Sequence, residues 1–77
     1  MSELKKSVQI KSFSTVIDCH SEEDLRHQIE LNFLQQSISI VTTNTSGVTT
    51  PNFIDVAANG ELTNSYSNKA YHYSDFF

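Results

Sequence analysis

The sequence has few of the residues that brace small proteins or carry their chemistry. Its 77 residues include one cysteine, two glycines, one proline and no tryptophan. A single cysteine cannot form an internal disulfide, so Cys19 could only cross-link to another chain. Two glycines are too few for the glycine-rich loops that cradle phosphates. The composition therefore excludes a disulfide-braced scaffold and argues against a phosphate-binding loop.

Positive charge is also scarce. Five Lys and Arg stand against nine Asp and Glu, so the formal net charge is −4. Nucleic-acid binding relies on clustered basic residues, so this balance argues against it. No apolar run approaches the length of a membrane span, and the polar start of the chain does not resemble a signal peptide. We therefore expect a cytoplasmic protein with a reduced thiol and no contact with a membrane.

The length of the chain indicates a single small domain covering residues 1–77. A chain of this size buries only about 60% of the surface that it exposes when unfolded. Such domains often gain stability from a disulfide, a metal or a partner subunit, so we expect a homo-oligomer. Residues 1–6 are predicted to be a frayed, charged lead-in, and residues 70–77 form an aromatic tail.

The stretch 21–36 carries the clearest helix signal. Ser21 is a good N-cap, and Asp24 is placed to reach back towards it as in a capping box. Three acidic residues in the first turn complement the positive end of the helix dipole. The apolar positions repeat at helical spacing and predict one buried stripe: Leu25, Ile29 and Phe33.

Leu31 and Leu34 lie off this stripe, near the end of the expected helix. Either the helix is apolar on two sides there, or it ends by about Asn32 and the following residues belong to a turn. We favour leucines that fill the edge of the core. The alternative is a patch that faces a partner.

Residues 7–19 have the composition of β structure. The apolar alternation changes phase near Lys11 and Ser12, which indicates either one bulged strand or a tight break between two short strands. We favour one bulged strand, because no Gly, Pro or Asn marks a turn there. The alternating positions on the two sides of the phase change are Val8 and Ile10, then Phe13, Thr15, Ile17 and Cys19.

After the helix, residues 37–43 are predicted to be a strand. The segment 44–47 supplies a loop with glycine at its end, and residues 48–50 return antiparallel. Pro51 is expected at a strand end or at a sheet edge, where its missing N–H does no harm. Residues 53–58 continue as a strand.

Asn59-Gly60 is the strongest hairpin signal in the chain. A two-residue turn there would pair Val56 with Thr63. We expect the face beneath the helix to gather an aromatic and aliphatic set: Phe53, Ala57, Leu62 and Tyr66.

Together these elements predict an α+β fold. One helix packs on a small antiparallel sheet of four to five strands, in the order β-α-β-β-β, with the option of a final strand. After Leu31 the only charged side chains are Asp55, Glu61, Lys69 and Asp75. Uncharged strand edges are poorly guarded against pairing with another chain, so the pattern favours strand-mediated association.

Residues that could carry chemistry are few and scattered. Cys19 and His20 are neighbours, but adjacent strand residues point to opposite faces, so a nucleophilic pair is not expected. One Cys and three dispersed His do not match the ligand spacing of a zinc site. We predict no catalytic residue, no metal and no cofactor.

The aromatic tail admits two interpretations. A final strand could bury these rings in the core, or the tail could dock into a partner. Five of the eight aromatic residues lie in the last twelve positions. The candidate partner-binding residues are Leu31, Leu34, Tyr71, Tyr73, Phe76 and Phe77.

The sequence therefore favours a non-enzymatic protein-interaction module, a small regulator or inhibitor that binds a larger protein as a homo-oligomer. The identity of that protein partner is not encoded in any motif. The alternative is a nucleic-acid or nucleotide binder that uses the tyrosines and the Asn and Thr side chains of the C-terminal half. Small acidic chains of this kind are common among accessory proteins of viruses and mobile elements.

Overall fold

A computed structural model describes residues 7–77. The predicted frayed segment 1–6 lies outside the described residues. Within 7–77 the chain forms one α-helix, one 3-10 helix and a six-stranded antiparallel sheet in the order β2-β1-β3-β4-β5-β6. The elements are β1 (Ser7–Lys11), β2 (Val16–Cys19), α1 (Glu22–Asn32), β3 (Ser37–Thr43), β4 (Thr49–Val56), β5 (Leu62–Asn64), β6 (Lys69–Tyr71) and the 3-10 helix η1 (Tyr73–Phe76).

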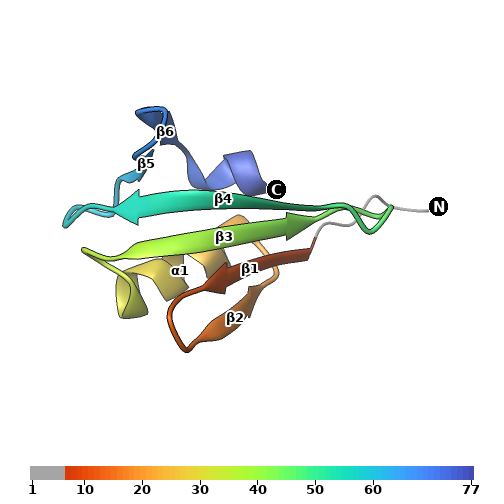
Figure 1. The fold of residues 1–77 in the computed structure, drawn as a ribbon. Coiled ribbons are helices and arrows are strands. Elements are labelled where there is room, and N and C mark those ends of the chain that lie inside the picture. Colours follow the sequence, from red (N-terminus) through yellow and green to blue (C-terminus); the bar gives the residue numbers. More distant parts are fainter. Residues whose placement is uncertain (1–6) are drawn as a thin grey trace.

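The α+β class is confirmed, but the described part of the chain has six strands rather than four to five. Figure 1 shows β3 and β4 running through the centre, with the β1–β2 hairpin on one flank and β5 and β6 on the other. The extra strands arise at the two ends of the fold. The N-terminal β segment is two strands, and the optional final strand is present as β6.

Helix α1 begins where its sequence predicts. The Ser21 side chain accepts a hydrogen bond from the backbone N–H of Asp24 at 3.1 Å, and the Asp24 carboxylate accepts from the N–H of His20 at 3.1 Å. The first bond satisfies a donor that the first helical turn leaves free, and the second ties the residue before the N-cap to the same turn. The helix ends at Asn32, with Phe33 as its C-cap. The shorter of the two predicted ends is therefore correct.

The expected single bulged strand over residues 7–19 is wrong. The chain instead makes an antiparallel hairpin in which Lys11 pairs with Val16. The N–H of Ser12 donates to the carbonyl of Thr15 at 2.9 Å and closes the turn. The phase change in the apolar pattern is therefore the position of a tight turn over residues 12–15, built without Gly, Pro or Asn.

The predicted strand 37–43 is confirmed, and it pairs along its whole length with β4. Asn44 supports the connecting loop, because its side-chain oxygen accepts from the N–H groups of Ser46 and Val48. Gly47 adopts a φ of 84°, a conformation that glycine reaches without strain. Strand β4 runs continuously through Pro51, opposite Val41.

The hairpin at Asn59-Gly60 is present, but its expected register is off by one residue. Val56 pairs with Leu62 rather than with Thr63, and Ala57 N–H donates to the carbonyl of Glu61. The loop has three residues and ends at Gly60, whose φ is 85°. A three-residue loop with a left-handed glycine is a common hairpin connection.

This slip of one residue reverses the expected faces of β4, because strand side chains alternate. The face beneath α1 includes Ile54, Val56 and Leu62. Leu62 is therefore buried as expected, whereas Phe53, Ala57 and Tyr66 are exposed. The core lies between one face of the sheet and the two helices, and its buried members are Val8, Ile10, Cys19, Leu25, Ile29, Phe33, Ile38, Ile40, Ile54, Val56, Leu62 and Phe76. The opposite face of the sheet has no covering layer within residues 7–77.

Candidate functional site

The uncovered face of the sheet, which we call the open face, is the most unusual surface of the described chain. It is formed by side chains that alternate with the buried ones. Lys11, Ser39 and Phe53 lie side by side on β1, β3 and β4. The surrounding side chains include hydroxyl groups and a few apolar groups, among them Ser37, Thr43, Thr49 and Thr63 beside Val16, Val41 and Pro51. Antiparallel sheets commonly expose one face, but such a face is normally polar.

Three aromatic side chains interrupt this polar surface. Phe13 in the β1–β2 turn is fully exposed at 105%, Phe53 on β4 is 55% exposed and Tyr66 in the β5–β6 turn is 85% exposed. The rings of Phe53 and Tyr66 meet edge to face with centroids 6.3 Å apart. The Tyr66 backbone is held by the side chain of Asn64, which accepts its N–H at 2.8 Å.

The three rings line a single shallow hollow of about 390 Å³. Ser37 and Ser39 on β3 lie between the two turns that carry Phe13 and Tyr66. The hollow is therefore aromatic at its rims and lined by small hydroxyl groups between them. Its lining residues are Lys11, Ser12, Phe13, Ser37, Ile38, Ser39, Phe53, Ile54, Asp55, Ser65 and Tyr66.

Charges of opposite sign lie on the two sides of this hollow. Lys11 lies on the β1 side and Asp55 on the β4 side, separated by β3. The Asp55 carboxylate accepts a hydrogen bond from the Ser37 hydroxyl. Further along the face, Gln9 donates to the Asp18 carboxylate at 2.7 Å. The acidic residues of the first turn of α1 are on the other side of the sheet.

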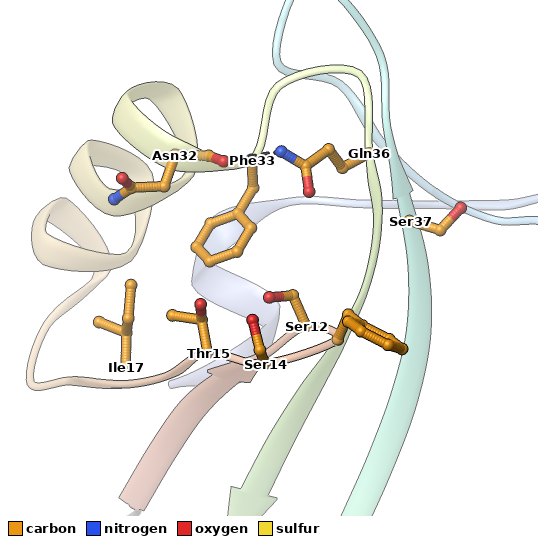
Figure 2. Close-up of a pocket in the computed structure, with 9 residues that line it drawn as sticks. Ser12, Ser14, Thr15, Ile17, Asn32, Phe33, Gln36 and Ser37 are labelled. Carbon is orange, nitrogen blue, oxygen red and sulfur yellow. Dashed lines mark hydrogen bonds between the residues drawn. The ribbon is translucent and has the colours of Figure 1, made fainter.

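A second hollow of about 560 Å³ lies between the β1–β2 turn and the end of α1. Figure 2 shows the Phe33 ring pointing from the helix end towards the turn, with Gln36 beside it. The Gln36 side chain is fixed by donating to the carbonyl of Asn32 at 2.9 Å. Phe33 itself is only 3% exposed, and the polar groups of this hollow are hydroxyls and side-chain amides. Phe13 borders both hollows.

The six residues predicted to bind a partner separate into two groups. Leu31 and Leu34 are 64% and 36% exposed, so they do not fill the edge of the core as we had favoured. Phe77 is 39% exposed, whereas Phe76 is 2% exposed and belongs to the core. Tyr71 and Tyr73 are partly buried and pack against that core.

The tail is tied to the rest of the fold by specific contacts. The Tyr73 hydroxyl donates to the carbonyl of Gly60 at 2.9 Å, and Arg26 of α1 lies 5.2 Å from the centre of the Tyr73 ring. Burial and the nearby Glu30 carboxylate raise the pKa of Tyr73, against the lowering effect of Arg26. The ring centroids of Tyr71 and Phe76 lie 5.6 Å apart. Most of the aromatic tail therefore contributes to the interior.

The candidates for chemistry are not assembled into a site. Cys19 is buried, and burial, Asp24 and Asp18 raise its pKa to about 11, so the thiol stays protonated at neutral pH. A nucleophilic cysteine needs the opposite shift. Among residues 7–77, no group of three or more His, Cys, Asp or Glu could hold a metal ion. No helix in the same range is long and apolar enough to cross a membrane.

The sequence did not single out the open face. The apolar alternation places Phe13 in a strand, and the expected hairpin register places Phe53 and Tyr66 under the helix. One signal was available: the turn Ser12–Thr15 places an aromatic residue between serines, where a buried ring is hard to accommodate. The rest depends on the register of the β4–β5 hairpin.

The chain matches no protein-family model, no curated protein and no solved structure. A function must therefore be inferred from the geometry alone.

Proposed function

We propose that this protein is a non-enzymatic interaction module, a small cytoplasmic regulator or inhibitor that acts by binding a larger protein and works as a homo-oligomer. The observation that carries this proposal is the open face, where three exposed aromatic rings surround one hollow. Aromatic residues at the centre of a surface patch often supply much of the affinity of a protein interface.

The surroundings of the hollow also suit a protein partner. Its rims offer apolar area, and the serines between them offer hydrogen bonds with little bulk, so a protein surface could be accommodated without burying many unpaired charges. The Cys19 thiol is buried, and burial together with the carboxylates of Asp24 and Asp18 raises its pKa, which disfavours the nucleophilic thiolate. These features support binding rather than catalysis.

Photo-cross-linking in cells of the source organism tests the proposal. A photoreactive phenylalanine analogue at position 13 should give covalent adducts with a larger protein or with a second copy of this chain, because this position is fully exposed beside the hollow. The matched control places the analogue at Thr45, an exposed position in the β3–β4 loop, and should give none of these adducts. Equal labelling from both positions, or no protein adduct from position 13, would contradict the proposal.

A nucleic-acid or nucleotide binder is the second candidate, because exposed rings on a sheet face can stack against bases. Lys11 is the basic residue that lines the hollow, and phosphate neutralisation by one lysine is weak. Titration with single-stranded oligonucleotides at low and high salt separates the two functions. Saturable, strongly salt-dependent binding that is lost in Phe53→Ser would favour nucleic acid over a protein partner.

A further inference from the structure

We infer that the open face packs against the open face of a second copy of this chain, forming a two-layered sheet with a helix on each outer side. This inference rests on the proposed function, because it identifies the occupant of the same surface and accounts for the expected homo-oligomer. Face-to-face packing of twisted sheets, with strands nearly aligned, is a common solution for sheets that share an apolar interior.

The hollow extends over both sides of β3. Phe13 and Lys11 lie on the β1 side of this strand, while Phe53, Tyr66 and Asp55 lie on the β4 side. A two-fold axis running along β3, between the two sheets, places the β1 side of one protomer over the β4 side of the other. Phe13 of each copy would then meet the aromatic pair of its partner, so the same patch is used twice.

The serines of β3 leave room for this arrangement. The small side chains of Ser37 and Ser39 follow one another along the proposed axis, and large aromatic rings lie on both sides of them. In a face-to-face pair the rings of one copy could therefore interdigitate with those of the other across this strip. Without a partner, the ring of Phe13 stays in water at full exposure.

Charge complementarity also favours a second copy as the occupant of the open face. The same two-fold axis brings Lys11 of one copy towards Asp55 of the other, and this happens twice in the dimer. Each protomer carries a formal charge of −4, which by itself opposes association. The acidic first turn of α1, Glu22, Glu23 and Asp24, lies on the covered side of the sheet. These three carboxylates are therefore held at the outside of the proposed dimer, while Asp18 stays on the open face beside Gln9.

The size of the open face also suits a dimer. Strand spacings of about 4.8 Å and a rise of about 3.4 Å per residue give the face an area on the order of 500 Å² in projection. Side chains raise the accessible area above the projected one, so the face approaches the roughly 800 Å² that each partner of a stable complex buries. The dimer would also leave α1, with exposed Leu31, on its outer surface for a larger protein.

A charge-swap experiment on the full chain tests the inference. Sedimentation equilibrium of the unchanged protein should give a dimer with a Kd on the order of 10 µM or tighter. Lys11→Asp places two carboxylates opposite each other at both contacts, and Asp55→Lys places two ammonium groups there. Each variant alone should therefore dimerise at least about tenfold more weakly. An equimolar mixture of the two variants should form heterodimers near the original affinity, because one of the two contacts in such a heterodimer keeps the original side chains and the other has them exchanged.

The controls separate misfolding from loss of the interface. Both variants should retain the circular dichroism spectrum of the unchanged protein. Phe53→Ser should also weaken the dimer, whereas Leu31→Ser, which removes an exposed leucine on the far side, should not. A monomer at all concentrations, dimerisation unaffected by either charge change, or a mixture that fails to restore it would overturn the inference. The proposed function would still stand if position 13 cross-links to a different protein.

Discussion

Pro51 faces Val41 across β3 and β4 in a pair whose backbone groups do not bond to each other. Two backbone bonds show which residue pairs of the β3–β4 ladder are bonded. The Asn44 N–H donates to the carbonyl of Val48, and the Val56 N–H donates to the carbonyl of Gln36. Bonded and non-bonded pairs alternate along an antiparallel ladder, so the even-numbered residues of β4 bond to β3. The missing N–H of Pro51 is therefore on the outer edge of β4, as its sequence context predicted.

That edge is exposed because β5 is short. β5 pairs with β4 only at Asp55 and Val56, so the earlier part of β4 has no neighbour on this side within the described chain. A proline in the middle of such an edge prevents a regular ladder with an added strand. At the other end of the sheet, the free edge of β2 is four residues long and carries Asp18. The free edge of β6 is three residues long and carries Lys69. Each of these three edges is short and charged or is interrupted by proline, which leaves the open face as the better surface for association.

The alternation predicts opposite effects for two neighbouring prolines. Thr50→Pro removes an N–H that bonds to β3, so it should lower the free energy of unfolding by about 3 kcal/mol or more. Thr49→Pro removes an N–H that faces the open edge, so it should cost less than about 1 kcal/mol. Urea unfolding followed by circular dichroism measures both. Equal losses would show that the inferred bonding pattern of β4 is wrong.

Restoring the missing backbone N–H at position 51 should allow the outer edge of β4 to pair with a strand of another chain. Pro51→Thr supplies an N–H on the outer side of β4 without disturbing its bonds to β3. We expect the variant to form species larger than those of the unchanged protein, detected by static light scattering over a range of concentrations. Asn52→Thr is the matched control, because the N–H of residue 52 points towards β3 and its replacement should leave the mass unchanged.

The sequence predicted correctly those features that local interactions determine. Ser21 and Asp24 marked the start of α1, and the Asn59-Gly60 pair marked a hairpin. The register of that hairpin could not be predicted from the sequence, because Asn-Gly is compatible with both two-residue and three-residue loops. One residue of slip exchanged the two faces of β4 and turned Phe53 from a predicted core residue into a surface one.

The open face could not be predicted for the same kind of reason. The turn after Lys11 is closed by one backbone bond between Ser12 and Thr15, without a residue that favours a turn. Apolar alternation alone therefore assigned Phe13 to a strand, although its ring is in water. Likewise, the exposure of Leu31 depends on where α1 sits on the sheet, which the helical period does not specify.

The last two residues should differ sharply in their contribution to stability. Phe76 is 2% exposed and packs against Tyr71, so Phe76→Ala should lower the free energy of unfolding by about 3–5 kcal/mol. Phe77 is more exposed, and Phe77→Ala should cost about 1 kcal/mol or less. Thermal unfolding of the two variants provides the comparison. A destabilised Phe77→Ala with an unaffected Phe76→Ala would contradict the packing of η1 against the core.

Alkaline pH should destabilise the fold through Cys19. Its pKa is 9.0 in an ordinary setting and about 11 here, chiefly because burial disfavours the thiolate, with Asp24 and Asp18 adding to the effect. A raised pKa means that the folded chain holds the proton more tightly, so this stabilisation is complete below about pH 9 and is lost as the pH rises towards about 11. The loss should reach on the order of 2 kcal/mol.

Urea unfolding at several pH values between about 8 and about 11 measures this loss. Cys19→Ala should lower stability at every pH, because it leaves a cavity, but it should flatten the pH dependence. Part of the dependence should persist, since Tyr73 also has a raised pKa, and the double variant with Tyr73→Phe should remove that part. An unchanged slope in Cys19→Ala would show that the thiol ionises as readily in the folded chain as in the unfolded one.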